Sequence, residues 1–249
     1  PVYFAAGESK KHIMDKIVEI IDGLFTSKVK SIGVSLPTKI DPEKGTIYDL
    51  SKIPHWKNIR LKTIIEDRFH VPTFINGDIH CFVWGEKSYG ACKEYKDIIC
   101  ITIDPSISTG VVVNNKLYSN LQASFSQAQC LSKANLKCVK EYHHSFMSTV
   151  EELLLLTTAY SKELEWPNHN FWKSIGPVVG RLATIMLCSF DSEVIVLGGE
   201  LSYSFDFCSD GIKDYIETYK PSHIKTRKKI IPSEIRNAKA IGAAYLSAS

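Results

Sequence analysis

The chain has 249 residues, of which 44% are hydrophobic and 23% charged, and its formal net charge at pH 7 is only +3. This length suits one large or two small domains with a buried core, and so small a net charge does not favour nucleic acid or an anionic membrane as partner. Seven cysteines without a CxxC pair favour a reducing compartment over a disulfide framework. The first residues, PVYFAAGESKKH, become charged before an apolar core develops, so we expect no signal peptide and a cytoplasmic protein.

The N-terminal part predicts helices alternating with strands. Apolar residues at helical spacing predict helices over Ser9–Phe25 and Ile59–Phe69. β-Branched runs predict strands over Val29–Leu36 and Pro72–Ile75. The DPEKG segment at Asp41–Gly45 has the composition of a turn.

The middle of the chain predicts a β-rich unit. Ile98–Ile103 and Thr109–Val113 are apolar, β-branched runs. Asn114-Asn115 follows the second run, so Lys116–Tyr118 is expected to return as the other strand of a hairpin.

The C-terminal part predicts further helices and strands. The helices are expected over Ser148–Tyr160, Ile175–Phe190, Ile212–Tyr219 and Ala238–Leu246, and the strands over Glu193–Leu197 and Lys229–Pro232. Arg181 interrupts the most apolar of these helices, which is too short to cross a bilayer and is expected to be buried. The alternation predicts an α/β fold. A change of composition at Tyr95–Ile99 suggests a first lobe of residues 1–95, joined by a closing helix at 236–249, and a second lobe of residues 96–235.

Asp78 lies in the segment FINGDIHCFVWGE, directly after an apolar run and before a helical pattern. A carboxylate at the end of a parallel strand lies where open α/β sheets bind ligands. There it could orient a sugar hydroxyl and accept its proton during phosphoryl transfer. The alternative is a helix N-cap, since Asp is a favoured cap residue.

Six segments, taken in chain order, resemble motifs of the ROK family (repressors, open reading frames and sugar kinases). The segments are SIGVSLPTKIDPEKG, SKIPHWKNIRL with Trp56, FINGDIHCFVWGE, the ICITIDPSISTG turn, VIVLGGELS and AKAIGAAYL. The resemblance covers about Val2 to Ser247. It implies a ribonuclease-H-like fold of the actin and sugar-kinase type, with two lobes that close on a ligand in the cleft between them.

The resemblance also implies site residues. Asp78 corresponds to the catalytic base, and Gly77 replaces the family's sugar-contacting Asn. The sugar-binding set is expected to be Pro37, Thr38, Asn76, Gly77 and Asp78. The nucleotide-binding set, in degenerate form, is expected to be Gly110, Gly198 and Gly199. For Gly198-Gly199 the alternative is a strand-to-helix turn that needs positive φ.

The phosphate-binding motifs depart from the family pattern. The glycine-rich turn GTGxGxG falls on Asp104, Pro105, Ser106, Ile107, Ser108 and Thr109, and only Gly110 remains. Asp104 would repel a polyphosphate and Pro105 lacks an amide donor, so ATP is expected to bind weakly or not at all. An ordinary solvated turn also explains these residues. The DxGGT hairpin has no counterpart, and it either precedes Pro1 or is missing.

Two further features of the sequence, a group of Cys and His residues and a basic run, have simple explanations that involve no ligand. Cys130, Cys138, His143 and His144 could bind zinc, but the C-x7-C-x4-H-H spacing is not a recognised zinc motif, and we expect no metal. The basic run Lys220–Lys229 is expected to be a solvated loop.

The expected function is that of a sugar-binding ROK-like protein with degenerate kinase motifs, serving as the sugar-responsive domain of a transcriptional regulator. One alternative is an active ATP- and Mg-dependent sugar kinase with Asp78 as base, and another is a dimerisation scaffold that binds no small molecule. The expected partners are a sugar or sugar phosphate and a second copy of the chain. DNA would be bound only through a domain upstream of Pro1, because no helix-turn-helix pattern is present.

Overall fold

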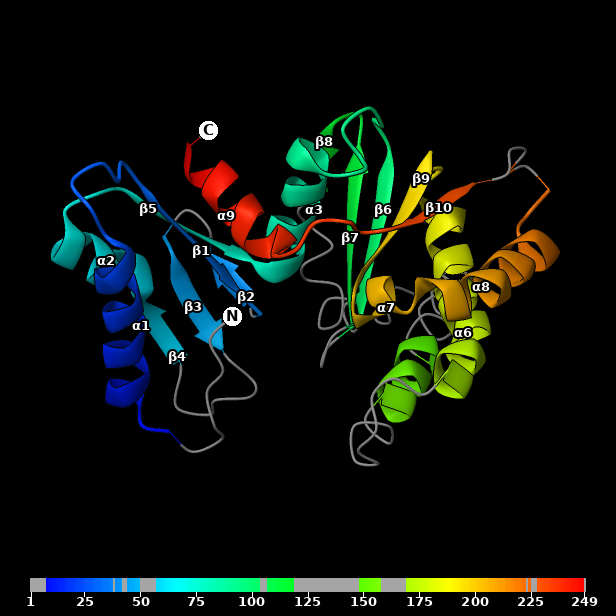
Figure 1. Cartoon of the computed structure of the whole chain (residues 1–249), viewed down its shortest axis with the longest axis horizontal. Coiled ribbons are helices and arrows are strands. Elements are labelled where there is room, and N and C mark those ends of the chain that lie inside the picture. The colour runs from blue at the N-terminus through cyan, green and yellow to red at the C-terminus, as the bar shows by residue number, and fades with distance from the viewer. Residues whose placement is uncertain are drawn as a thin grey trace, which may run out of the picture. The chain divides into compact units, whose positions relative to one another are not determined.

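The computed structural model describes residues 8–37, 39–41, 44–49, 57–103, 107–118, 148–157, 169–222, 224 and 228–248 (Figure 1). The chain forms two compact units, Pro1–Gly85 with Asn237–Ser249, and Glu86–Arg236. The division falls inside a helix, whereas composition suggested Tyr95–Ile99. The assignment of residues 1–95 and 96–235 as functional lobes stays a prediction.

The first unit contains helices around two small sheets. Its helices are α1 (Lys10–Leu24), α2 (Leu61–Phe69), the first part of α3 (Asp78–Tyr89) and α9 (Ala238–Ala248). Its strands are β1 (Ile32–Leu36), β2 (Lys39–Asp41), β3 (Thr46–Asp49), β4 (Lys57–Arg60) and β5 (Thr73–Gly77). β1 pairs with β5 in parallel, and β2, β3 and β4 form an antiparallel sheet. The predicted helices and the β1 and β5 strands are confirmed, whereas the short strands β2 to β4 were not predicted.

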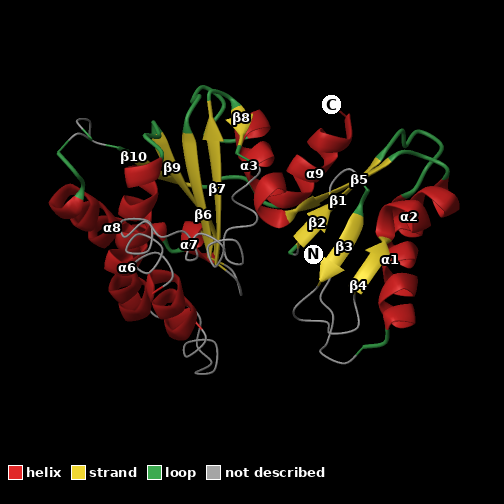
Figure 2. Ribbon diagram, turned by 180° about the vertical axis from the view of Figure 1, so that it is seen from behind, coloured by secondary structure: helices red, strands yellow, loops and turns green. Residues whose placement is uncertain are grey.

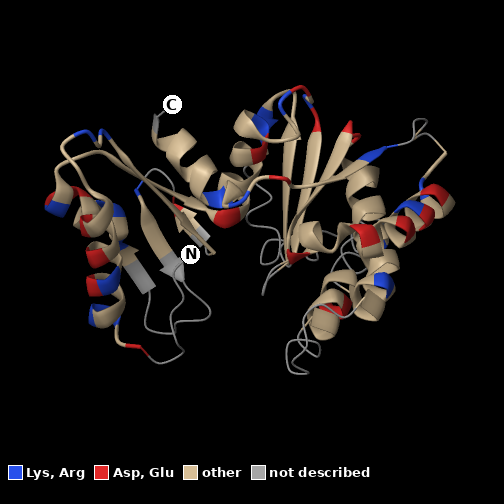
Figure 3. Cartoon of the chain, in the orientation of Figure 1, with Lys and Arg blue, Asp and Glu red and all other residues tan. Residues whose placement is uncertain are grey.

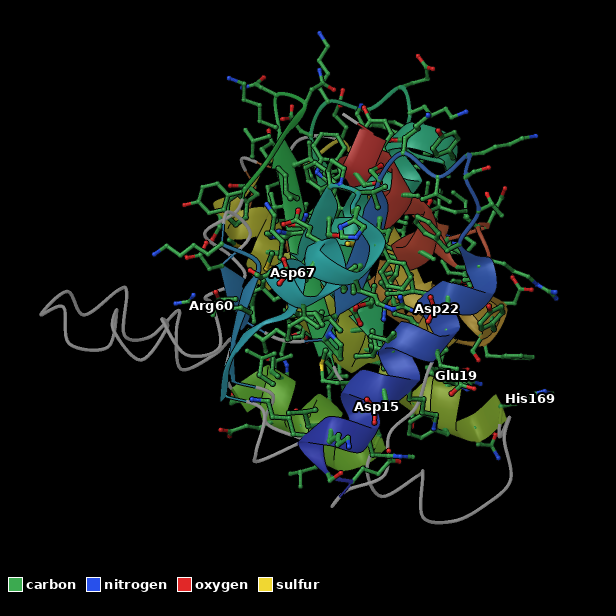
Figure 4. The ribbon with its side chains drawn as sticks, turned by 90° about the vertical axis from the view of Figure 1, so that its left-hand side faces the viewer. Asp15, Glu19, Asp22, Arg60, Asp67 and His169 are labelled. Atoms are coloured by element: carbon green, nitrogen blue, oxygen red, sulfur yellow. The ribbon has the colours of Figure 1, made fainter. Side chains whose placement is uncertain are left out.

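Helix α1 shows how the sequence pattern builds this unit. The Ser9 side chain accepts a hydrogen bond from the His12 backbone N–H, which caps the helix start. Asp15, Glu19 and Asp22 lie three and four residues apart on the exposed face (Figure 4). The apolar face contributes Ile13 to the core that α1 and α2 share with the strands. The pattern therefore orients α1 with its charged side toward solvent.

The second unit is built on a mixed five-stranded sheet in the order β10-β9-β6-β7-β8. The strands are β6 (Ile98–Ile103), β7 (Ile107–Val113), β8 (Lys116–Leu117), β9 (Val194–Gly199) and β10 (Lys229–Pro232). β6, β9 and β10 run parallel, and β7 is antiparallel to β6 and β8. The helices are α6 (His169–Ser189), α7 (Glu200–Tyr203), α8 (Phe205–Tyr219) and a further helix over residues 148–157.

Central strand β6 is buried along its whole length, as expected for a strand covered on both faces. Ile99, Ile101 and Ile103 belong to the core shared with α6 and α8. These two helices lie side by side against the sheet (Figure 2). Asn114 and Asn115 both have positive φ, which confirms the predicted two-residue hairpin turn.

The surface helices carry charges of both signs. Acidic and basic residues both occur along α1 and α8 (Figure 3), a distribution typical of solvated helix faces. Among the helices that the structure describes, none has the length and apolar content needed to cross a membrane.

Candidate functional site

The carboxyl ends of the two parallel strands of the first unit place the predicted catalytic residue. Strand β1 ends at Leu36, which is paired with Gly77, the last residue of β5. Asp78 follows Gly77 directly and is the first residue of α3. It therefore lies where α/β sheets bind their ligands and where the positive end of a helix dipole favours an anionic group.

Both carboxylate oxygens of Asp78 are engaged. The Ser35 hydroxyl on β1 donates a 2.6 Å hydrogen bond to Oδ1. The Lys239 ammonium on α9 lies 3.3 Å from Oδ2, and the side chains of Lys239 and Asp78 are 33% and 21% exposed. The N-cap alternative gains no support, because no backbone N–H in the described chain donates to this carboxylate. A ligand hydroxyl that approaches Asp78 must share an oxygen with one of these donors or displace it.

The residues behind Asp78 are neutral and buried. Burial raises the pKa of the Cys81 thiol to about 12, and this thiol interacts with the Ser35 hydroxyl. Burial also lowers the pKa of His80 to about 4, so its imidazole is uncharged near pH 7. The charged groups that act on the Cys81 thiol are Asp78 and Lys239.

Close backbone packing holds α9, and with it Lys239, against this site. A Cβ atom on Gly242 would overlap the carbonyl oxygen of Cys81 in α3. A Cβ atom on Gly33 in β1 would overlap the carbonyl oxygen of Ala243. Only glycine allows helix and strand backbones to approach this closely. The segment AKAIGAAYL, one of the six that resemble ROK motifs, therefore also determines where Lys239 lies.

The predicted sugar-binding residues partly gather at the same strand ends. Asn76 is half-buried on β5 and pairs in register with Ser35, and Gly77 is buried beside Leu36. Pro37 follows β1 and is exposed. Thr38 and Trp56 lie outside the described residues. A sugar-binding role for this set stays a prediction.

The predicted nucleotide-binding glycines lie in the second unit. Gly198 and Gly199 end β9 and pair with Thr102 and Ile103 at the carboxyl end of β6. Gly199 has a φ of 69° and precedes α7, so the strand-to-helix turn, which needs a glycine, accounts for it without a ligand. Gly110 is buried within β7, opposite Cys100. Asp104, Pro105 and Ser106 lie outside the described residues.

A fully buried carboxylate lies further along α3, in the second unit. Glu86 is fully buried, and its Oε1 accepts a 2.5 Å hydrogen bond from the hydroxyl of Ser233, which follows β10. Its Oε2 accepts a 3.4 Å hydrogen bond from the Ala91 backbone N–H. Burial raises the pKa of the Glu86 carboxyl group. The contact with Ser233 joins α3 to the segment after β10, so a structural role accounts for the burial of Glu86.

The remaining sequence features add no site in the described chain. The four zinc candidates, Cys130, Cys138, His143 and His144, lie outside the described residues, and within those residues no group of three or more His, Cys, Asp or Glu side chains could hold a metal ion. In the basic run, Lys220 pairs with Glu217 and Lys228 with Asp191. The Lys229 ammonium donates to the Tyr95 hydroxyl at 2.8 Å.

Sequence analysis did not identify Ser35 or Lys239. Ser35 lies within an ordinary β-branched strand, IGVSL. Lys239 offered one signal, since it is the single charged residue of α9, in the sequence AKAIGAAYLSA. A lone lysine in a helix of small and apolar residues indicates a charge that must find a partner where the helix packs.

Comparison with known proteins finds sequence similarity between this chain and one family. The family model described as "ROK family" matches residues 5–122. The xylose repressor of Bacillus subtilis is 23% identical over 257 residues, which cover 92% of this chain and 65% of the repressor. The glucokinase of Thermotoga maritima is 22% identical over 276 residues, which cover 95% of this chain and 84% of the kinase. The chain thus spans slightly less than two thirds of the repressor's length.

A solved structure has the same fold. The ROK family glucokinase from Streptomyces griseus, in complex with glucose and AMPPNP, superposes with a TM-score of 0.70 at 17% identity, over 98% of this chain and 90% of that chain. The predicted α/β, ribonuclease-H-like fold of the actin and sugar-kinase type is confirmed. The predicted resemblance to the ROK family is therefore confirmed, in sequence over residues 5–122 and in fold along nearly the whole chain.

Proposed function

We propose that this chain is the sugar-binding region of a ROK protein that responds to a sugar without transferring a phosphoryl group efficiently. The observation that carries the proposal is the environment of Asp78, whose two oxygens are engaged by Ser35 and Lys239. A carboxylate in this position can accept a hydrogen bond from a sugar hydroxyl. As a catalytic base it would also have to take the hydroxyl proton on an oxygen already occupied by a donor.

The sequence at the phosphate-binding turn supports the same proposal. Asp104 and Pro105 replace glycines and oppose the close approach of a polyphosphate. The similarity to the xylose repressor supports a role as the sugar-responsive part of a transcriptional regulator. Contact with DNA would then come from residues outside this sequence. We place Asn76, Gly77, Asp78, Pro37 and Thr38 in contact with the sugar.

A sugar kinase is the second candidate. It is favoured by the position of Asp78 at the end of β5 and by the similarity to the Thermotoga maritima glucokinase along most of both chains. This candidate would need Mg-ATP, held near Gly110, Gly198 and Gly199, with Asp78 as base.

A ligand panel separates the candidates. Thermal unfolding is followed with hexoses, pentoses, amino sugars and their phosphates, each with and without Mg-ATP, and ADP release is measured in parallel. A ligand at about one hundred times its Kd stabilises by about 2.7 kcal/mol. We expect a sugar to raise the Tm, Mg-ATP to add nothing, and ADP release to stay at background. Sugar-dependent ADP release would establish the kinase, and no response to any sugar would favour the scaffold.

The Asp78→Asn variant tests the site itself. We expect sugar affinity to fall by about tenfold or more, because the charged acceptor of a sugar hydroxyl is removed. Asp67→Asn is the matched control, since Asp67 is exposed on α2 (Figure 4). Equal loss in both variants, or full affinity in Asp78→Asn, would remove Asp78 from the sugar site.

A further inference from the structure

We propose that Lys239 is an internal competitor at Asp78, whose ammonium occupies the carboxylate in the sugar-free chain and leaves it when a sugar hydroxyl binds there. This inference rests on the proposed function, because it concerns how access to the same site is regulated. The observations that carry it are the 3.3 Å contact between the Lys239 ammonium and Asp78 Oδ2, the partial exposure of both side chains, and the close packing that fixes α9.

The Asp78 carboxylate has little free surface left for a ligand. Its side chain is 21% exposed, and the Ser35 hydroxyl, from the part of β1 that pairs with β5, donates to Oδ1 at 2.6 Å. The other oxygen faces the ammonium of Lys239, whose side chain is 33% exposed. A serine hydroxyl stands one rotatable bond from its strand, whereas a lysine ammonium ends a flexible four-carbon stem. The lysine is therefore the donor that a ligand displaces more easily.

The backbone of α9 cannot carry the ammonium away from the site. A Cβ atom on Gly242 would overlap the Cys81 carbonyl oxygen, and one on Gly85 would overlap the carbonyl oxygen of Ala238, the neighbour of Lys239. These contacts press α9 directly against α3 and fix the position of the lysine Cα atom. Only the side chain can move, so the ammonium stays tethered close to the carboxylate, at a high effective concentration, whether or not a sugar is bound.

A tethered competitor lowers the apparent affinity of the site for a sugar without any change of fold. The apparent Kd equals the intrinsic Kd divided by the fraction of chains in which the carboxylate is free. An ion pair between two partly exposed side chains is modest in strength, so a sugar that makes several further contacts can displace it. The pair of Lys239 and Asp78 therefore raises the sugar concentration at which the site begins to fill.

Isothermal titration calorimetry on the 249-residue chain tests the competition. The probes are D-glucose, D-xylose and N-acetylmannosamine, all of them neutral. Lys239→Met removes the ammonium and keeps an apolar stem, and we expect it to bind a sugar about fivefold more tightly than wild type does. Lys239→Arg should bind like wild type, because the positive charge remains. Lys11→Met, which removes an exposed lysine of α1 in the same unit, is the matched control and should leave the affinity unchanged.

Three further readouts separate competition from a change of structure. In an Asp78→Asn background, Lys239→Met should bring no gain in affinity, because no ion pair remains to be broken. Because the probes are neutral, KCl between about 0.05 and 0.5 M should act through the ion pair, raising the affinity of wild type about twofold and leaving Lys239→Met unchanged. The near-ultraviolet circular dichroism, to which Trp84 stacked on Tyr245 of α9 contributes, should be the same in Lys239→Met and wild type.

The outcomes also separate this inference from the proposed function. A sugar that binds wild type as tightly as Lys239→Met, or more tightly, would overturn the inference and leave sugar binding in place. A gain that persists in the Asp78→Asn background, or that comes with an altered circular dichroism signal, would also overturn it. Binding by Lys239→Met alone would support the competition in its strongest form. If no sugar binds any variant, both the inference and the proposed function fail.

Discussion

At the scale of single residues, the buried groups of α3 control how stability depends on pH. His80 is 7% exposed, and its burial lowers its pKa from 6.5 to about 4. As the pH falls below 6.5, the unfolded chain binds a proton that the folded chain excludes. The contribution of His80 to stability is therefore complete above about pH 6.5 and is lost as the pH falls toward about 4.

The His80→Asn variant tests this contribution. We expect wild-type stability to fall by about 3 kcal/mol between pH 7 and pH 4 from this group alone, and the fall to be smaller by that amount in the variant. Urea unfolding at several pH values measures it. His70→Asn is the matched control, because His70 is exposed and has a left-handed conformation that asparagine accepts. The same pH profile in wild type and His80→Asn would contradict the prediction.

Glu86 acts in the opposite direction. Burial raises its pKa, so the folded chain holds the proton more tightly than the unfolded chain, and its contribution to stability is greatest below about pH 4.5 and declines as the pH rises. Glu86→Gln does not titrate. We therefore expect the stability of this variant relative to wild type to improve as the pH rises from 4.5 toward 8, and to level off once Glu86 is ionised in the folded chain, as judged by urea midpoints.

A control keeps the Glu86 experiment specific. Glu94→Gln, which replaces an exposed glutamate of the same unit, is the matched control over the same range. A constant difference for Glu86→Gln would show that burial does not perturb this carboxyl group.

At the scale of elements, the docking of α9 determines whether the site exists. We expect Gly242→Ala to destabilise the chain by about 3 kcal/mol, because the new methyl group would overlap the Cys81 carbonyl oxygen in the backbone of α3. Gly23→Ala is the matched control, with open space around it inside α1, and it should stabilise by about 0.5–1 kcal/mol. Chemical unfolding of both variants measures the difference, and a neutral Gly242→Ala would refute the close packing.

At the scale of the whole molecule, a homodimer stays a prediction, and sedimentation equilibrium is expected to give twice the chain mass of 28.0 kDa. The apolar face of Ile175–Phe190 is occupied in the core of its own unit, so it is not available as a dimer surface. Tyr203 and Tyr219, the last residues of α7 and α8, are exposed apolar side chains at 72% and 62%. A mass of 28.0 kDa at all concentrations would contradict the prediction.

The sequence by itself determined the features that depend on local pattern. Helical periodicity located α1, the apolar run Ile98–Ile103 gave β6 with its exact bounds, and motif order predicted the family and its fold. These features could be read because a period of 3.6 or 2 residues, or a turn residue, is encoded within a short window. Strands β2 to β4 could not be predicted from the sequence, because three or four residues are too few to show a period.

Only the tertiary structure decided what surrounds Asp78. Ser35 lies 43 residues before it in sequence, and Lys239 comes from the far end of the chain. No local pattern encodes these neighbours, because they result from strand pairing between β1 and β5 and from glycine contacts that seat α9. The sequence identified the carboxylate, and packing between distant segments supplied the hydroxyl and the ammonium that define what it can bind.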